Sequence, residues 1–281
     1  MEFLTLAIVF MFGAIIGSFL NVVIYRYNSG TSPIRGRSQC FVCGKILHWY
    51  ELVPLVSFLV QRGRCRGCAA RLSWQYPLVE VLSGVLFVAV YALQKPLIES
   101  LYLVIVFSIL LVIAVYDLRH QIIPDGLAAA FALLSVIWFL WYVPGGLVRA
   151  VHFPYYWTLI AGPLLFLPFW VLWFFSRGRW MGLGDGKLAL GIGWFLGATR
   201  GGSAVMFGFW IGAVLSLAIM AAQRVHKKLV TSKSAKLASS PLSFQSEIPF
   251  GPFLILGVFI VYFTGVNFFD GSITLFDFLF Q

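Results

Sequence analysis

The chain has 281 residues, of which 60% are hydrophobic and only 11% are charged, and its mean hydropathy is +0.92. A soluble domain of this length carries roughly a quarter charged residues, so the composition excludes a water-soluble globular protein. The net charge of +10 does not indicate a nucleic-acid partner. The basic residues gather in two loops, a pattern that marks the cytoplasmic side of a membrane protein.

Blocks of apolar residues follow one another along the chain, most of them long enough for a helix to cross the hydrocarbon. The first block lacks a basic start and a small-residue cleavage site, so it is predicted to be a retained span and not a signal peptide. The sixth block is short and is expected to be tilted or partly re-entrant. We predict an all-α polytopic membrane protein with about eight transmembrane helices, at residues 3–25, 77–94, 100–116, 126–143, 157–175, 188–199, 203–222 and 250–267.

Two basic segments fix the predicted orientation. Residues 26–71 hold eight Lys or Arg against the single acid Glu51, and residues 224–236 hold five and no acid. By the positive-inside rule both segments are cytoplasmic, and the even number of predicted spans between them agrees with this. Both termini are then predicted to lie outside. The Ser/Lys-rich residues 232–246 are predicted to form a flexible loop.

All four cysteines fall in the first basic segment, as Cys40-x₂-Cys43 and, after 21 intervening residues, Cys65-x₂-Cys68. This spacing predicts a structural Zn²⁺ site with four thiolate ligands. Two disulfides are the alternative, and the reducing cytoplasm disfavours them. We predict three parts: a first transmembrane span over residues 1–25, a small zinc-braced cytoplasmic subdomain over 26–75, and a membrane domain over 76–281.

Four acids lie where a predicted span meets the cytoplasm: Glu80, Asp117, Asp125 and Asp185. A carboxylate at the edge of the hydrocarbon is costly, so each is a candidate functional residue. Asp125 follows a proline and precedes a helical run, and capping of that helix explains it well. Glu80 can be explained as a hydrogen-bonded or snorkelling acid. For Asp117 the alternative is an interfacial acid paired with Arg119.

Asp185 stands in the glycine-rich stretch 182–187, Gly-Leu-Gly-Asp-Gly-Lys. Glycines allow close backbone approach, as an extended substrate beside a catalytic acid would require. The alternatives are an Asx-turn or a helix cap; the spacing fits neither the phosphate loop nor the dinucleotide fingerprint. Two facing carboxylates can share a proton, so that one acts as general base on water while the other polarises a peptide carbonyl.

Gly182-Leu183-Gly184-Asp185 resembles the GxGD signature of membrane aspartyl proteases. Asp117, followed by Ile123-Pro124-Asp125, is similar to the matching segment of bacterial type IV prepilin peptidases. Residues 17–23, 76–80 and 249–252 resemble further family segments in the same order.

The resemblance implies that Asp117 and Asp185 are the catalytic pair. It also implies type IV prepilin or pseudopilin substrates, for pili or type II secretion, and a place in the bacterial inner membrane with the active site facing the cytoplasm. In the family, cleavage accompanies N-methylation of the mature pilin with S-adenosylmethionine as donor. The sequence shows no donor-binding motif, so the residues that would bind this cofactor are unknown.

A polytopic transporter with functional interfacial carboxylates is the alternative function. Transporters more often place such acids near the midplane on broken helices, whereas the acids here gather at one face. Gly193 and Gly197, four residues apart, are interpreted as helix-packing glycines. The four histidines lie in loops or at span ends and none belongs to a His-Glu-x-x-His helix, so serine-protease and metalloprotease sites are both disfavoured.

Overall fold

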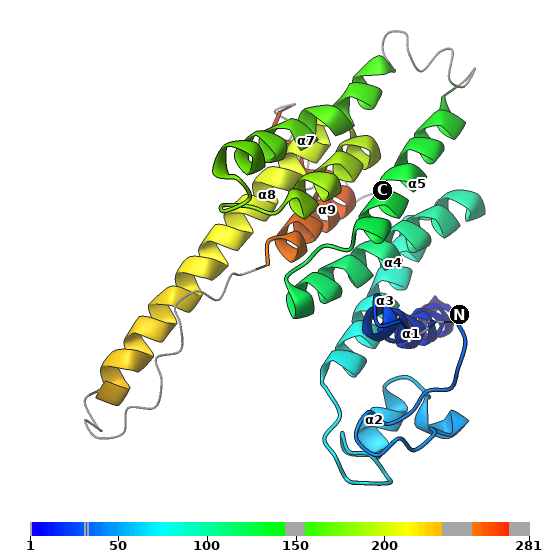
Figure 1. The fold of residues 1–281 in the computed structure, drawn as a ribbon. Coiled ribbons are helices and arrows are strands. Elements are labelled where there is room, and N and C mark those ends of the chain that lie inside the picture. The colour runs from blue at the N-terminus through cyan, green and yellow to red at the C-terminus, as the bar shows by residue number, and fades with distance from the viewer. Residues whose placement is uncertain (1, 31, 33, 144–154, 232–248, 270–281) are drawn as a thin grey trace. The chain divides into compact units, whose positions relative to one another are not determined.

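The computed structural model describes residues 2–30, 32, 34–143, 155–231 and 249–269. Within these ranges the regular structure is helical, and the β-type pairing consists of two isolated bridges. The helices are α1 (Glu2–Arg26), the short η1 (Trp49–Glu51), α2 (Val56–Val60), α3 (Gln75–Ala92), α4 (Leu97–His120), α5 (Asp125–Tyr142), α7 (Tyr156–Ser176), α8 (Leu183–Thr231) and α9 (Gly251–Thr264) (Figure 1).

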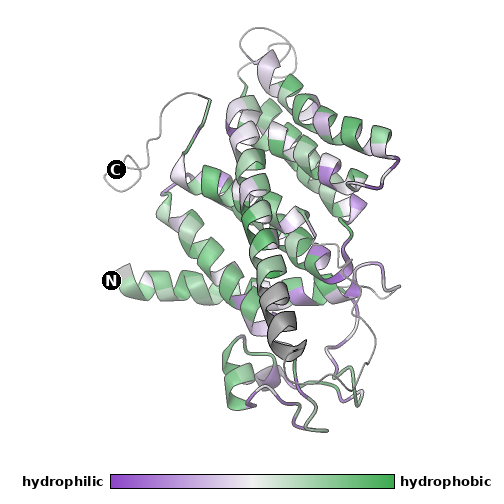
Figure 2. Ribbon diagram, turned by 90° about the vertical axis from the view of Figure 1, so that its left-hand side faces the viewer, coloured by the Kyte–Doolittle hydropathy of each residue, from purple (hydrophilic) through white to green (hydrophobic). Residues whose placement is uncertain are grey.

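Six of the described helices are long and apolar enough to cross a membrane: α1, α3, α4, α5, α7 and α8. A chain in hydrocarbon has to satisfy its backbone polar groups internally, which a helix does. Hydrophobic residues dominate these helices, and hydrophilic residues gather in loops and at helix ends (Figure 2). The predicted all-helical, multi-pass fold is confirmed.

Two predicted spans, 188–199 and 203–222, fall within the single element α8 of 49 residues. Gly197 interrupts this element with φ 80° and ψ 178°, so α8 is two helical segments that meet at a kink. A side chain added at Gly197 would meet open space, so the packing interpretation of this glycine is wrong: its role is the backbone bend. The last predicted span is α9, which has 14 residues. The predicted loop 232–246 lies outside the described residues.

The first of two compact units covers residues 1–115. In it α1 packs closely against α3. A Cβ placed on Gly17 would lie 2.8 Å from the Cα of Glu80, so only glycine allows this approach. The Ser83 hydroxyl donates a hydrogen bond of 2.7 Å to the carbonyl of Gly13 on α1. The chain between these two helices therefore begins and ends at adjacent points.

The segment between α1 and α3 is fastened to both helices. Tyr25, near the end of α1, stacks on Phe41 and on Tyr76, with ring centroids 5.2 Å apart in each pair. The buried Glu80 accepts a hydrogen bond of 2.8 Å from the backbone N–H of Leu55. Glu80 is thus a hydrogen-bonded acid that joins α3 to the segment. This agrees with the explanation of Glu80 as a hydrogen-bonded acid in the sequence analysis.

The second unit covers residues 116–281, and α8 packs against α5, α7 and α9 within it. A Cβ on Gly193 would collide with the carbonyl of Ala161 on α7, which confirms Gly193 as a packing glycine. The indole N–H of Trp194 donates a hydrogen bond of 2.9 Å to the carbonyl of Leu159. These contacts hold the start of α8 among its neighbours, where the glycine-rich stretch lies.

Candidate active site

Asp117 lies in the last turn of α4 and is 4% exposed. Its Oδ2 accepts a hydrogen bond of 3.1 Å from the backbone N–H of Gly251, the first residue of α9. The N-terminal end of a helix carries partial positive charge, which favours a carboxylate at this position. A Cβ on Gly251 would lie 2.7 Å from that same Oδ2, so a larger residue at this position would displace the carboxylate.

Asp185 lies in the first turn of α8 and is half-buried, and the two glycines of the motif that precede it have different surroundings. A Cβ on Gly182 would meet the Asp185 Oδ2 at 4.0 Å, an ordinary contact distance. A Cβ on Gly184 would lie 3.0 Å from the Cβ of Ile123, which is tighter than ordinary packing. Of these two glycines, Gly184 is therefore the one that is closely packed.

The side chain of Ile123 links the two aspartate segments. It is 7% exposed and follows α4 in the connection to α5. Its Cβ faces Gly184, and its Cδ1 lies 3.2 Å from the Cβ position of Gly251. The carboxylates of Asp117 and Asp185 are close enough for their charges to interact. The structure thus brings together the two residues that the sequence singled out.

Asp125 is placed differently from the sequence interpretation. It is the first residue of α5, Pro124 occupies the capping position, and no side chain caps this helix. The capping interpretation is therefore wrong. The exposed Asp125 instead accepts a hydrogen bond of 2.7 Å from the Nζ of Lys187, in the first turn of α8. This ion pair joins the N-terminal ends of α5 and α8.

Sequence reasoning missed the structural roles of Gly251 and Ile123. The signal for Gly251 was the segment Pro249-Phe250-Gly251-Pro252, because a proline near the first position is typical of a helix start. The connection before α5, through Ile123, and the N-terminal end of α9, through Gly251, both contribute to the surroundings of the two aspartate segments. Ile123 carries no comparable signal, since one buried isoleucine resembles any other.

Two family models match this chain. The Bacterial Peptidase A24 N-terminal domain matches residues 11–94, and the Type IV leader peptidase family matches residues 104–219. A prepilin leader peptidase/N-methyltransferase of Klebsiella pneumoniae is 34% identical over 204 residues, which are 69% of this chain and 86% of that protein. The chain belongs to the type IV leader peptidase family.

Other prepilin leader peptidase/N-methyltransferases are similar to this chain as well. That of Bacillus subtilis is 29% identical over 260 residues, which cover 92% of this chain and 94% of that protein. That of Myxococcus xanthus is 35% identical over 226 residues, covering 76% of this chain and 62% of that protein. No solved structure matches the chain.

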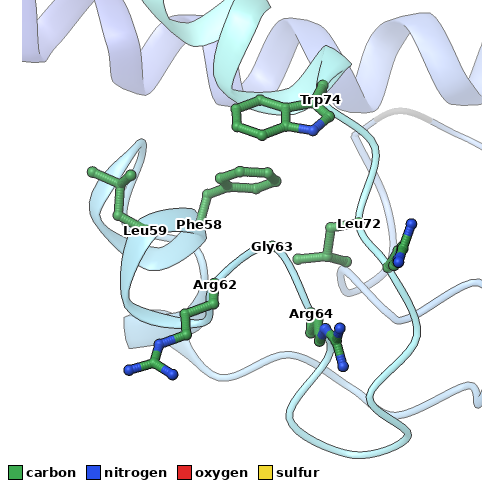
Figure 3. Close-up of a pocket in the computed structure, with 8 residues that line it drawn as sticks. Phe58, Leu59, Arg62, Gly63, Arg64, Leu72 and Trp74 are labelled. Atoms are coloured by element: carbon green, nitrogen blue, oxygen red, sulfur yellow. The ribbon is translucent and has the colours of Figure 1, made fainter.

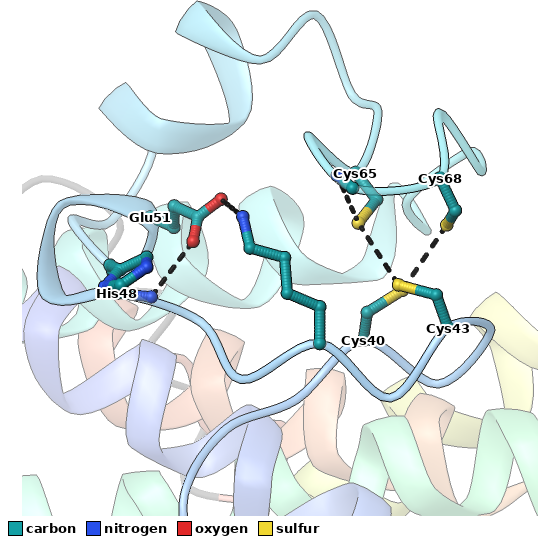
Figure 4. A network of polar contacts seen from close by, with 8 residues as sticks. Cys40, Cys43, His48, Glu51, Cys65 and Cys68 are labelled. Atoms are coloured by element: carbon teal, nitrogen blue, oxygen red, sulfur yellow. Dashed lines mark hydrogen bonds and ion pairs between the residues drawn. The ribbon is translucent and has the colours of Figure 1, made fainter.

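The N-terminal family domain of this leader peptidase contains the four cysteines, and the structure gathers them (Figure 4). Their Sγ atoms all lie within 4.8 Å of one another, with Cys40–Cys68 at 3.9 Å and Cys43–Cys65 at 4.0 Å. A tetrahedral zinc with Zn–S bonds of about 2.3 Å holds its sulfurs roughly 3.8 Å apart. Disulfide sulfurs lie about 2.05 Å apart, so the cluster fits a metal site and not the two disulfides.

Each cysteine pair stands in a turn of the same design. The carbonyls of Cys40 and Cys65 accept hydrogen bonds of 2.9 Å from Gly44 and Ala69, and the N–H groups of the same cysteines donate to Lys45 and Ala70, also at 2.9 Å. An isolated bridge closes each turn, Gln39 with Ile46 and Arg64 with Arg71. The backbone N–H groups of Cys43 and Val42 lower the pKa of the Cys40 thiol to about 6, which favours the thiolate that a metal binds.

One buried acid supports the first of these turns (Figure 4). Glu51 accepts a hydrogen bond of 3.0 Å from the backbone N–H of His48 and one of 2.9 Å from the Nζ of Lys45. The His48 N–H and the Lys45 ammonium hold the pKa of Glu51 below its ordinary value of 4.5. Its charge is therefore satisfied inside the subdomain.

Proposed function

We propose that this leader peptidase removes the leader peptide from type IV prepilins or pseudopilins by an aspartyl mechanism and then N-methylates the new N-terminus. Membership of the family and the names of the similar proteins support this activity. The observation that carries the mechanism is the meeting of Asp117 and Asp185 around Ile123. Peptide hydrolysis by a carboxylate pair needs no metal and no nucleophilic side chain.

The surroundings of the two acids suggest different roles. Asp117 accepts the Gly251 N–H at the end of a helix, which stabilises its carboxylate, so we assign it as general base. Asp185 would hold the shared proton and donate a hydrogen bond to the scissile carbonyl. Asp117 takes a proton from water, and the water oxygen bonds to the carbonyl carbon. When the C–N bond breaks, Asp117 returns that proton to the leaving amine.

The topology that fits this site has eight crossings, with the two segments of α8 counted separately and α9 as the last. The C-terminal end of α4, the N-terminal ends of α5 and α8, and the cysteine segment then share the cytoplasmic face, where the basic residues are expected. Both termini then lie on the outer side of the bacterial inner membrane. The proposed parts are the span 1–25, the cysteine subdomain 26–75 and the peptidase domain 76–281.

The cysteine cluster would hold a structural Zn²⁺ through Cys40, Cys43, Cys65 and Cys68, with every coordination position filled by sulfur. This metal would brace a subdomain too small for a large core of its own. S-adenosylmethionine would supply the methyl group. No described residues are assigned to bind it.

The test is co-expression of the enzyme with a prepilin, followed by mass spectrometry of the pilin N-terminus. We expect a mature chain that lacks its leader and carries one additional methyl group. A prepilin that keeps its leader beside a correctly inserted enzyme would refute the peptidase function. Cleavage without methylation would refute only the second activity.

A further inference from the structure

A cavity with a strongly basic lining lies in the first unit, beside the start of α3 (Figure 3). Its volume is about 530 Å³. Three arginines and four apolar side chains line it, together with Gly63: Arg62, Arg64, Arg71, Phe58, Leu59, Leu72 and Trp74. None of these residues belongs to the proposed aspartate pair or to the cysteine cluster.

Two of the arginines face each other across the bridge that closes the second cysteine turn, Arg64 opposite Arg71. Like charges directly opposite each other on paired strands repel and destabilise the pairing. The three ion pairs of the described residues involve other side chains, so no acid there neutralises Arg62, Arg64 or Arg71. An anion bound between them would remove the repulsion.

The rest of the lining is apolar and in part exposed. The rings of Phe58 and Trp74 lie 5.0 Å apart at 57°. Leu59 is 71% exposed and Trp74 75% exposed. Gly63 has φ 65°, and a Cβ there would lie 3.1 Å from the Cζ of Phe58, so the turn after α2 folds tightly against this ring. The cavity thus offers cationic and apolar surfaces side by side.

Its place in the fold brings the cavity to the membrane surface. Trp74 directly precedes α3, one of the candidate membrane spans. The hydrogen bond from Leu55 to Glu80 ties the segment just before α2 to the first turns of α3. Tryptophan is enriched at membrane–water interfaces, where phospholipid headgroups lie.

We propose that this cavity binds the headgroup of an anionic phospholipid, with the arginines on the phosphate and the Leu59, Phe58 and Trp74 side chains against the glycerol and upper acyl chains. Basic pockets at the cytoplasmic side of membrane proteins bind such headgroups. A cationic occupant such as a basic leader peptide would be repelled by the same arginines. The proposal does not depend on the peptidase mechanism.

The test is native mass spectrometry of the detergent-purified full chain titrated with phosphatidylglycerol or phosphatidylcholine. We expect one tightly bound phosphatidylglycerol, and affinity about 30-fold lower in the double variant Arg64→Gln/Arg71→Gln. The variant Arg35→Gln/Arg37→Gln removes the same charge from the same subdomain outside the cavity and should bind as the unchanged chain does. Arg64→Lys/Arg71→Lys keeps the charge and should restore most of the binding.

Equal loss in both glutamine variants would overturn the site, because a general effect of net charge would then explain it. Equal binding of phosphatidylcholine would overturn the requirement for an anionic headgroup. Inorganic phosphate at the lipid's concentration should not displace the lipid; full displacement would make the site one for free phosphate. Loss of binding in the lysine variant as well would exclude charge as the basis of recognition.

Discussion

The backbone N–H of Gly251 donates a hydrogen bond to the Oδ2 of Asp117 across 3.1 Å, although the two residues lie 134 positions apart in the chain. This contact brings the first turn of α9 to the buried end of α4. It makes the surroundings of Asp117 different from those of Asp185, and the different catalytic roles proposed for the two aspartates depend on this difference.

Replacement of Gly251 by alanine tests this contact. The added Cβ would lie 2.7 Å from the Asp117 Oδ2, so the carboxylate has to move. A displacement of about 1 Å at a reacting group costs on the order of 100-fold in rate, and we expect kcat/KM for prepilin cleavage to fall by about that factor. Unchanged cleavage by Gly251→Ala would contradict the proposed position of Asp117.

The two glycines before Asp185 provide a matched pair of variants. Gly184→Ala would press on Ile123 at 3.0 Å, whereas Gly182→Ala would make only an ordinary contact at 4.0 Å with Asp185. We expect Gly184→Ala to lose cleavage about tenfold or more, and Gly182→Ala to stay within about threefold of the parent enzyme. Equal losses would show that the tight packing at Ile123 is not what distinguishes the two positions.

Asparagine variants separate the proposed catalytic acids from the neighbouring one. Asn has nearly the shape of Asp but cannot serve as a base, so Asp117→Asn and Asp185→Asn should each lower the cleavage rate at least about 100-fold. Asp125→Asn removes an exposed ion pair with Lys187 worth about 0–1 kcal/mol and should cost little. A single-turnover assay with membrane-inserted variants measures these rates. Rapid cleavage by either of the first two would refute the assignment.

The cysteine cluster makes a prediction about metal content. Purified protein should carry about one zinc per chain, and Cys40→Ser together with Cys43→Ser should release it. Limited proteolysis of the 26–75 segment should then become faster, while the membrane helices stay protected. Elemental analysis and mass spectrometry check both points. Metal-free protein with two disulfides would reverse the zinc proposal and the cytoplasmic placement together.

Glu51 makes the subdomain sensitive to acid. Its pKa lies below the ordinary 4.5 because the His48 N–H and Lys45 stabilise the carboxylate in the folded state. The stabilisation is therefore complete above pH 4.5 and is lost as the pH falls through the lower, folded-state pKa. The protection factors of residues 45–51 in hydrogen exchange, which correct for the intrinsic pH dependence of amide exchange, should fall over that range. In Glu51→Gln they should already be lower at neutral pH and lose this part of their pH dependence.

The sequence was informative where chemistry depends on residue type and spacing. The two Cys-x₂-Cys pairs predicted the cluster. The positions of the acids at span ends gave four candidates, and the resemblance to the prepilin peptidases selected Asp117 and Asp185 among them. Contacts between distant segments were not predictable in this way: nothing near Asp117 indicates Gly251. Gly193 and Gly197 look alike in an apolar run, yet one packs against α7 and the other bends α8. Asp125 follows a proline and precedes a helical run, which predicts a cap, and its actual partner Lys187 lies 62 positions further along the chain.

The close packing of α1 against α3 has a consequence for how the subdomain gains and loses its metal. The packing of α1 against α3 holds the ends of the intervening segment together whether or not zinc is bound. Most of the loss of chain entropy on closing this loop therefore occurs when the two helices pack, and not when zinc binds. Loss of the metal would then leave the segment attached at both ends to the packed helices α1 and α3. Reassembly on adding zinc would then proceed within one chain at a rate constant that does not depend on the protein concentration, and the subdomain would exchange its metal without the peptidase unfolding.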